Sequence, residues 1–228
     1  MSVGLLDEGF RTSLPLRIRY DHGGWSPLAI PRWQGAARGA DAGLLARAAG
    51  RTLDVGCGPG RLASALVRAG IPALGIDISP SAVRLTRLAG APAVLSSVFE
   101  DVPDVGSWNG AVLADGNIGI GGDPVRLLQR MRELLAPRGQ VLVELERPGI
   151  ESTVQRIRLE ADGGRTGSWF AWSLLGVDAV AGTAAAAGLT VEEVWSAADS
   201  DDEVSVTPGS AQDLMTGEHR WFAALRVA

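Results

Sequence analysis

The chain has 228 residues, of which 46% are hydrophobic, and a formal net charge of −5. An acidic chain lacks the basic surface that phosphate binding needs, so we do not expect nucleic acid as a partner. No run of 18 apolar residues occurs, and the N-terminus lacks the basic-then-apolar pattern of a signal peptide. We therefore expect a cytoplasmic protein that makes no membrane contact. The length suits one α/β domain with some elaboration.

The cysteine and lysine content limits the chemistry further. Cys57 is the only cysteine, so neither an intramolecular disulfide nor a multi-cysteine metal site is possible, and we expect no metal. All 21 basic residues are arginines, which excludes a lysine Schiff base or a lysine general base.

Residues 1–50 come before the first predicted core strand and carry no assignable motif. We interpret them as an N-terminal lid or cap that leads into a helix near 39–49, where Leu44, Leu45 and Ala48 have helical spacing. His22 lies in this lid, next to an aspartate. It is a candidate general base for an acceptor hydroxyl, and the alternative is a surface or capping histidine.

A repeating β-α pattern runs from 51 to about 146. Ser79-Pro80 and Asp123-Pro124 mark helix starts, because a capping side chain is followed by a first-turn proline. The strands are short and almost continuously apolar, as expected for a sheet that helices cover on both faces. We predict strands at 52–55, 73–77, 93–97, 109–114 and 140–145, and helices at 60–69, 80–89 and 124–135.

The β-α pattern breaks between 147 and 175. Residues 154–159 alternate like a strand, and we interpret the region as a possible substrate-site insertion. A helix at about 176–187 follows, and the last two strands are predicted at 189–195 and 220–227.

Four of the seven tryptophans fall in the two regions without motifs: Trp25, Trp33, Trp169 and Trp172. One interpretation is an aromatic acceptor pocket, since amphipathic rings suit mixed ligands. The other is that the lid needs apolar residues to dock on the domain.

The segment from Asp54 to Gly60 is the most informative motif. An apolar run ends in Asp54, glycines follow at 56, 58 and 60, and a helical run comes next, which predicts the strand, turn and helix of a nucleotide-binding unit. A dinucleotide fingerprint that starts at Gly56 needs a third glycine where this chain has Arg61. The second predicted strand ends in Asp77, about twenty residues past the turn, where a ribose-binding carboxylate is expected.

These residues resemble motif I of the class I S-adenosylmethionine-dependent methyltransferases. The resemblance implies an α/β fold with a doubly wound, seven-stranded, mostly parallel sheet of order 3-2-1-4-5-7-6, whose last strand is antiparallel. It rests on motifs over about 50–146 and on pattern alone over 176–228, so that 51–228 would form the Rossmann-like methyltransferase domain. It also implies S-adenosylmethionine as the cofactor and S-adenosylhomocysteine as the product.

The resemblance assigns cofactor contacts residue by residue. Asp54 would orient the glycine turn, Asp77 would accept hydrogen bonds from both ribose hydroxyls, and Ile78 would lie against the adenine. The loop after the third strand resembles the adenine-contacting loop of the family, in which an acid often stands where this chain has Val98. The implied cofactor-binding residues are Asp54, Gly56, Cys57, Gly58, Gly60, Asp77, Ile78, Val98, Phe99, Ala114 and Asp115.

The glycine-rich segment 114–123 follows the fourth predicted strand. In the implied fold strands 1 and 4 are neighbours, and ligands bind in the crevice at their carboxyl ends, where the strand order reverses. Asp115 and Asn117 are therefore candidate catalytic residues near the sulfonium and the acceptor, together with His22. The alternative is a glycine-rich helix connection in which Asp115 and Asn117 only form turns.

We predict methyl transfer to a small-molecule acceptor, because the chain has no separate domain for a macromolecular substrate. Oxygen or nitrogen is favoured over carbon as the methylated atom. A second hypothesis is an S-adenosylmethionine-binding regulatory or interaction protein without transferase activity. A third is a nicotinamide oxidoreductase, which Arg61 disfavours.

Overall fold

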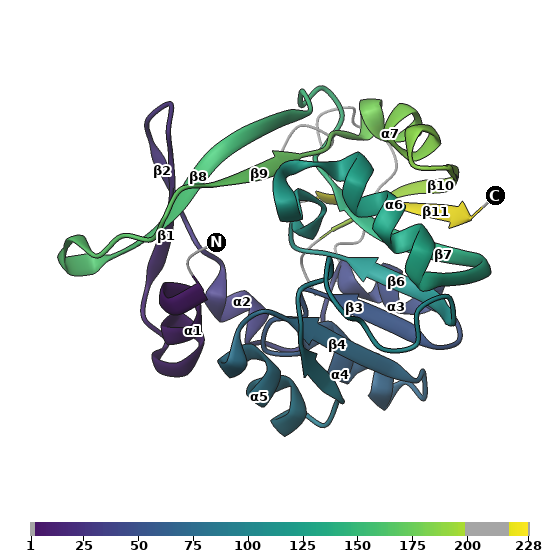
Figure 1. The fold of residues 1–228 in the computed structure, drawn as a ribbon, viewed down its shortest axis with the longest axis horizontal. Helices are drawn as coiled ribbons and strands as arrows, with labels where there is room; N and C mark the ends of the chain where they lie inside the picture. Colours follow the sequence, from purple (N-terminus) through teal and green to yellow (C-terminus); the bar gives the residue numbers. More distant parts are fainter. Residues whose placement is uncertain (1–2, 199–218, 228) are drawn as a thin grey trace, which may run out of the picture.

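The computed structural model describes residues 3–198 and 219–227, which form two β-sheets (Figure 1). The larger, core sheet has seven strands in the spatial order β10-β11-β7-β6-β3-β4-β5. Counted along the chain within this sheet, that order is 3-2-1-4-5-7-6, which confirms the predicted fold. Its strands are β3 (Thr52–Val55), β4 (Ala73–Asp77), β5 (Ala93–Leu95), β6 (Trp108–Leu113), β7 (Leu135–Leu145), β10 (Leu189–Ala198) and β11 (His219–Val227).

The strands of the core sheet are parallel except for β11. β3 pairs in parallel with both β4 and β6, while β11 runs antiparallel to β7 and β10. The strand predicted at 140–145 begins earlier, at Leu135. The Pro137-Arg138-Gly139 sequence is a bulge inside β7 and not a turn before it, since Leu135 pairs with Trp108 and Gln140 already pairs with Gly110.

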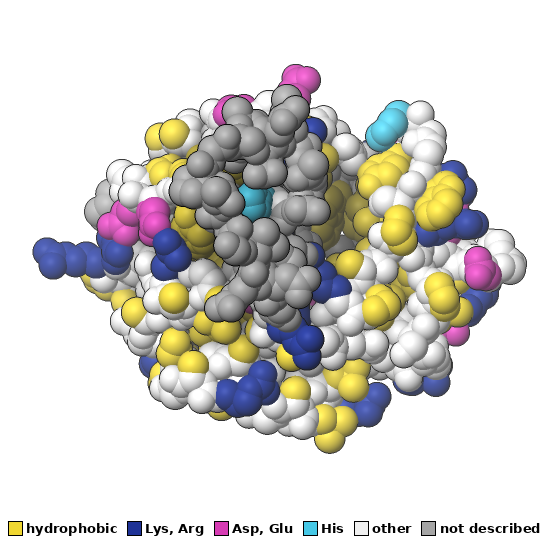
Figure 2. Space-filling view, turned by 180° about the vertical axis from the view of Figure 1, so that it is seen from behind, with side chains coloured by type: hydrophobic (Ala, Val, Ile, Leu, Met, Phe, Trp, Pro, Cys, Tyr) yellow, Lys and Arg dark blue, Asp and Glu magenta, His cyan; other side chains and the backbone are white. Residues whose placement is uncertain are grey.

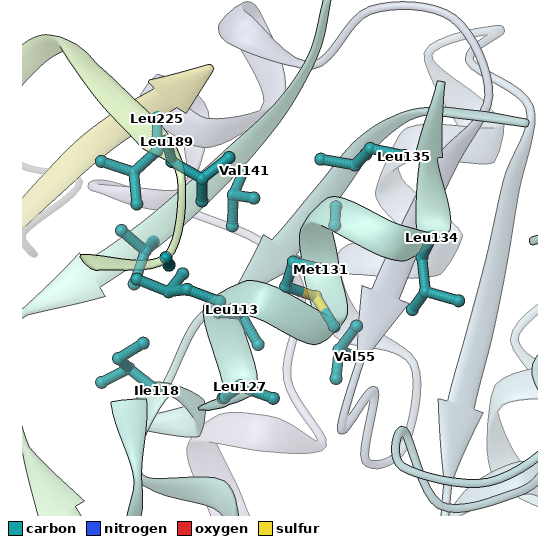
Figure 3. Close-up of a cluster of buried hydrophobic side chains, with 14 of the residues drawn as sticks. Val55, Leu113, Ile118, Leu127, Met131, Leu134, Leu135, Val141, Leu189 and Leu225 are labelled. Carbon is teal, nitrogen blue, oxygen red and sulfur yellow. The ribbon is translucent and has the colours of Figure 1, made fainter. Parts of the chain in front are cut away.

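Helices cover both faces of the core sheet. On one face α6 (Pro124–Leu134) and α7 (Val180–Ala186) enclose the main hydrophobic cluster, and Figure 3 shows α6 side chains against strand residues such as Val55 and Leu113. On the other face α3 (Asp41–Arg47) and α4 (Arg61–Arg68) pack on alternate strand residues. The edge helix α5 (Pro80–Leu88) starts where predicted, because the Ser79 hydroxyl accepts a hydrogen bond from Ala82 N.

The second sheet, which we call the lid sheet, joins the two regions without motifs. It has the order β2-β1-β8-β9, with every pair antiparallel. β1 pairs with β8 although about 140 residues separate Ile18 from its partner Leu159. The strand predicted at 154–159 is confirmed as part of β8. The strands are β1 (Leu16–Tyr20), β2 (Trp25–Pro27), β8 (Thr153–Ala161) and β9 (Phe170–Leu174).

Two helices complete the lid, α1 (Val3–Thr12) and α2 (Ile30–Trp33). The sequence pattern did not predict α1. Its Asp7 carboxylate accepts hydrogen bonds from the Ser79 hydroxyl and from Ser81 N, both at 2.7 Å, and so ties the lid to the start of α5. Burial is the largest single influence on the pKa of Asp7 and raises it. The hydrogen bonds together outweigh burial, so the pKa is lowered. None of the described helices has the length and apolar character needed to span a membrane.

Candidate active site

A cavity of about 480 Å³ lies between the carboxyl ends of the core strands and the lid. The core contributes glycines, carboxylates, Arg61 and the loop after β5 to its wall. The lid contributes only apolar and aromatic side chains, among them Phe10, Ile18, Trp33, Ile157, Phe170 and Trp172. Figure 2 shows hydrophobic side chains gathered along the hollow beside the lid. The polar groups of the cavity therefore all come from its core wall, whereas its lid wall is apolar.

The glycine turn after β3 forms part of the polar wall. Gly56, Gly58 and Gly60 have φ angles of +70°, +54° and +92°, in the left-handed region that favours glycine. A Cβ at Gly60 would lie 2.7 Å from Thr86 Cα, and one at Gly56 would lie 2.8 Å from Asn117 Nδ2. At Gly58 an added Cβ would meet only Phe10 Cζ, at 3.8 Å. Gly60 and Gly56 thus permit close packing, whereas Gly58 leaves the cavity side open.

The Asp77 carboxylate is held by backbone donors on both of its oxygens. Gly58 N donates to Oδ2 at 2.9 Å, and Ser79 N donates to Oδ1 at 2.8 Å. Burial raises the pKa of Asp77, while these backbone bonds oppose the rise. The carboxylate lines the cavity next to Ile78, and its remaining lone pairs can accept hydrogen bonds from a ligand.

Asp54 is more deeply buried, with 3% of its surface exposed. Its Oδ2 accepts a hydrogen bond from Ala63 N in the first turn of α4, at 2.9 Å, so it orients the helix that follows the turn. Burial raises the pKa of Asp54 to about 7, and the charges of Asp115 and Asp77 add to the rise against the Ala63 bond. The carboxyl group also lines the cavity.

Cys57 lies within the turn and is buried. Burial raises the pKa of its thiol, and its Sγ lies 3.5 Å from Thr86 Oγ1. A buried neutral thiol acts as a small packing group, although Cys57 also lines the cavity.

The loop after β5 closes one end of the cavity through Val98 and Phe99. Arg130 on α6 fixes this loop, because its guanidinium donates to Val98 O and Glu100 O at 2.9 Å each. A second α6 arginine, Arg126, lies over the Phe99 ring at 4.5 Å. No motif in the sequence indicated a role for either arginine.

Asp115 belongs to a cluster of buried and half-buried charges that we call the arginine–carboxylate cluster. It consists of Arg61, Arg220, Asp41, Asp115 and Glu144. Arg61 bonds to both Asp41 and Asp115, and Arg220 lies 2.7 Å from Asp41 Oδ1 and 2.6 Å from Glu144 Oε2. The Asp115 backbone N also donates to Glu144 Oε2, at 2.5 Å.

The arginine–carboxylate cluster fixes Asp115 at the cavity wall. Asp115 has a φ of +54°, a conformation unusual for a residue with a side chain, and its carboxylate is bonded by Arg61 while Arg220 lies 3.4 Å away. Arg32 on the lid helix α2 lies 3.8 Å from the same carboxylate. Sequence reasoning found Asp115 but missed its partners, since they lie far apart in the chain.

Asn117 clamps the glycine turn. Its Nδ2 donates to Val55 O at 2.9 Å and to Gly56 O at 3.1 Å. These two hydrogen bonds connect the segment after β6 to the end of β3. Asn117, Asp115 and Ala114 all line the cavity, as the predicted position at the carboxyl ends of β3 and β6 requires. A catalytic role for Asp115 or Asn117 stays a prediction.

The structure does not bring His22 to this cavity. His22 follows β1 in the exposed turn before β2, with its Nδ1 3.7 Å from Asp21 Oδ1 and its ring 5.4 Å from that of Tyr20. Its environment is that of the surface histidine that the sequence analysis offered as the alternative, and its proposed role as a general base stays untested.

The four lid tryptophans divide into two pairs. Trp33 and Trp172 line the cavity. Trp25, which is 56% exposed, and Trp169 lie instead under the guanidinium groups of Arg17 and Arg158, at 5.8 and 4.7 Å. Only one pair is therefore placed to contact a ligand in the cavity.

The strand order, the glycine turn and the carboxylate at the end of β4 together define a class I S-adenosylmethionine-dependent methyltransferase. A family model described as "Methyltransferase domain" matches residues 36–194. The chain belongs to this family and is an S-adenosylmethionine-dependent enzyme.

Solved structures at low sequence identity share the fold. A methyltransferase from Bacteroides fragilis in complex with S-adenosyl-L-homocysteine is 20% identical, with a TM-score of 0.72 over 100% of this chain and 94% of that one. One from Mesorhizobium loti is 20% identical, with a TM-score of 0.57 over 85% and 99% of the two chains. The 1,6-didemethyltoxoflavin-N1-methyltransferase from Burkholderia thailandensis is 17% identical, with a TM-score of 0.52 over 78% and 71%.

Proposed function

We propose that this enzyme transfers the methyl group of S-adenosylmethionine to oxygen or nitrogen of a small molecule with an apolar body. One observation carries the proposal: the polar core wall and the apolar lid wall face each other across a single cavity of about 480 Å³. A volume of this size is typical of sites for small molecules and cofactors. The core wall suits the cofactor, and the lid wall suits the acceptor.

The residues of the core wall fit the cofactor. Asp77 would accept hydrogen bonds from the ribose hydroxyls, because backbone donors already fix its orientation. Ile78 and the loop of Val98 and Phe99 would enclose the adenine. Gly58 leaves room for the methionine part, since an added Cβ there meets nothing closer than 3.8 Å.

Bound S-adenosylmethionine supplies a methyl group on a positively charged sulfur, which departs as a neutral thioether. The chain's own contribution is to hold the acceptor in line with that methyl group, a positioning effect worth up to roughly 7–11 kcal/mol in favourable cases. Trp33 and Trp172 would hold the acceptor ring or chain, and the apolar lid would exclude water from the cavity.

Two carboxyl groups of this cavity are poorly placed to remove a proton from an acceptor. Asp54 is only 3% exposed and bonded by Ala63 N, and Asp77 is bonded by Gly58 N and Ser79 N. No histidine is among the described residues that line it. The Asp115 carboxylate is already bonded by Arg61 and approached by Arg220, so its oxygens are not free to bond an acceptor hydroxyl. We therefore infer an acceptor that is nucleophilic as bound, such as an uncharged amine or an ionised phenol.

Two tryptophans on one segment of the lid provide a matched test. Trp172→Ala removes a ring that lines the cavity, whereas Trp169→Ala removes a ring outside it. Labelled methyl transfer to a panel of small amines and phenols is measured for wild type and both variants. We expect Trp172→Ala to raise the acceptor KM about tenfold or more, and Trp169→Ala to behave as wild type.

Calorimetry with S-adenosylhomocysteine serves as the control, and both variants are expected to bind it normally. A Trp172→Ala enzyme with wild-type turnover on the accepted compounds would place the acceptor elsewhere. A protein that binds S-adenosylhomocysteine but methylates no compound of the panel would favour the regulatory alternative. Binding of a nicotinamide dinucleotide in its place would favour the oxidoreductase.

A further inference from the structure

A second cavity, of about 310 Å³, lies on the other side of the segment that carries Asp115. It is bounded by the end of β7, the start of β11, the residues after β6, and β9. Asp115 and Asn117 line the first cavity, while Gly116 between them lines the second. On β9, Trp172 likewise lines the first cavity and Ser173 the second. The two cavities thus share a thin wall.

Within the described ranges 3–198 and 219–227, three polar side chains around the second cavity have no hydrogen-bond partner. Ser173 is 1% exposed, and its buried Oγ has no partner. The buried Nδ1 of His219 has none either. The half-buried Glu146 carboxylate makes no hydrogen bond or ion pair within the part of the chain that the structure describes.

The neighbouring carboxylate, Glu144, is in the opposite situation. Its Oε1 accepts from Arg220 Nε at 2.8 Å, and its Oε2 accepts from Arg220 Nη2 and from Asp115 N. Glu144 therefore belongs to the arginine–carboxylate cluster, and Glu146 is left as a carboxylate of the cavity without an ion pair, next to Arg147, which also lines the cavity. Burial raises the pKa of Glu146, and the charge of Glu144 raises it further, while the exposed Arg147 partly offsets both.

The three unpartnered groups share one capacity. A carboxylate, a hydroxyl oxygen and an unprotonated imidazole nitrogen all accept hydrogen bonds, and a primary ammonium group carries three donors and no acceptor. Arg147 and Arg220 also line the cavity, but the three unpartnered acceptors favour a ligand that donates hydrogen bonds. No set of three acidic, histidine or cysteine side chains among the described residues is arranged to hold a metal ion. Leu145, Ile150 and Leu175 add apolar surface for a carbon skeleton.

We propose that the second cavity binds the primary ammonium group of a small organic amine, with Glu146 as its counter-ion and Ser173 and His219 as further acceptors. The amine is either a separate molecule or an amino group of the methyl acceptor itself. This inference goes beyond the proposed function, because binding in the second cavity requires no methyl transfer.

The test uses a panel of primary amines, from methylamine to 2-phenylethylamine, each paired with the alcohol of the same carbon skeleton. Binding to the full chain is measured by calorimetry and by thermal shift, with and without saturating S-adenosylhomocysteine. We expect at least one amine to bind saturably while its alcohol does not. Glu146→Gln should weaken that binding about tenfold or more, and Ser173→Ala should weaken it less.

Glu151→Gln is the matched control, because this exposed carboxylate lies five residues further along and outside the cavity. The proposal is overturned if no amine of the panel binds, if amine and alcohol bind alike, or if Glu146→Gln binds as wild type. Normal binding of S-adenosylhomocysteine by Glu146→Gln shows that the variant is folded. It also separates failure of this site from failure of the proposed function.

Two further measurements show whether the bound amine is the methyl acceptor or a separate ligand. Mass spectrometry after incubation with S-adenosylmethionine shows whether the bound amine is methylated, as an acceptor would be. An amine that binds without being methylated, and still binds when S-adenosylhomocysteine is present, is a separate ligand of the second cavity. Both results support the site, and they assign its occupant.

Discussion

The carboxylates beside the glycine turn of the core and the buried carboxylate of the lid sheet are held in different ways. In the core, Asp54 and Asp77 accept hydrogen bonds from backbone N–H groups at helix starts and turns. In the lid, Glu160 accepts from the side chains of Arg17, Arg19 and Arg158. The pKa of Asp54 is raised to about 7, mainly by burial, whereas hydrogen bonds from Arg19 and Arg158 lower the pKa of Glu160 to about 2.

The difference indicates that the core and the lid have different roles in ligand binding. Backbone donors are fixed by the fold, so the core presents rigid acceptors to one cofactor. In the lid sheet, Glu160 and its arginine partners do not line the cavity, and the lid gives the cavity only apolar surface. We therefore expect changes in the core to alter cofactor affinity, and changes in the lid to alter the choice of acceptor.

The largest effect is expected from Gly60→Val. The added Cβ would lie 2.7 Å from Thr86 Cα, so the backbone of α5 would have to move, and φ is +92°. We expect loss of the cooperative thermal transition in circular dichroism. Gly70→Val is the control, because its φ is +78° but nothing lies within 4 Å of an added Cβ. It should cost only about 1–2 kcal/mol, and an equal loss in both variants would mean that φ alone is decisive.

The pH dependence of stability should separate core from lid. The pKa of Asp54 is about 7 in the folded protein, against an ordinary value of 3.8, so between these values the folded state holds a proton that the unfolded state has released. Stability should therefore fall as pH rises from about 4 to 7, by up to about 4 kcal/mol. In Asp54→Asn, denaturant titrations should show this slope removed. A slope that persists in the variant would assign it to other groups.

Glu160 supplies the comparison with opposite sign. Its lowered pKa means that the folded state has released a proton that the unfolded state still binds between about 2 and 4.5. This stabilising contribution is present above pH 4.5 and is lost as pH falls toward 2. In Glu160→Gln, the free energy of unfolding should depend less on pH below about 4.5, and its slope above pH 4.5 should be unchanged.

A smaller effect is expected at Asp77, the carboxylate proposed to bind the ribose. Asp77→Ala removes an acceptor proposed to make two charge-assisted bonds, each worth roughly 1.5–3 kcal/mol. The affinity for S-adenosylhomocysteine should fall by about tenfold to a hundredfold or more in calorimetry. Asp101→Ala, which changes an exposed acid, is the control. Unchanged affinity in a folded Asp77→Ala protein would remove Asp77 from the site.

The smallest effect is expected from Asn117→Ala. This change leaves Val55 O and Gly56 O without a donor, so the melting temperature should fall by an amount that corresponds to about 1–2 kcal/mol, with a modest loss of cofactor affinity. A large drop in kcat with normal stability would instead support the predicted catalytic role of Asn117.

The sequence predicted those parts of the fold that depend on local signals. The glycine turn, the helix starts at Ser79 and Asp123, and the apolar strands indicated the core sheet and its order. The pairing of β1 with β8 was not predictable, because nothing local to Ile18 refers to Leu159. The helix α1 was not predicted, since its apolar residues pack on the lid and on α5, and most of these partners lie far away in the sequence.

The candidate site divides in the same way. Asp54, Asp77 and the three turn glycines belong to one motif and were found. Arg61 was noticed only as the residue that breaks a dinucleotide fingerprint, yet it bonds to Asp41 and Asp115 in the structure. The members of its cluster come from separate elements, and only the folded chain brings them together.

The two ends of the chain offer unequal attachment points. Asp7 accepts a hydrogen bond from the Ser79 hydroxyl, and Ser79 N donates to Asp77, so α1 is two hydrogen bonds away from the carboxylate proposed to bind the ribose. β11 runs antiparallel to β7, so it ends on the side of the sheet where the parallel strands begin, away from the cavity. Figure 1 shows the C-terminus there. An affinity tag or an immobilising linker thus belongs at the carboxyl end, where it leaves the contact between Asp7 and α5 undisturbed.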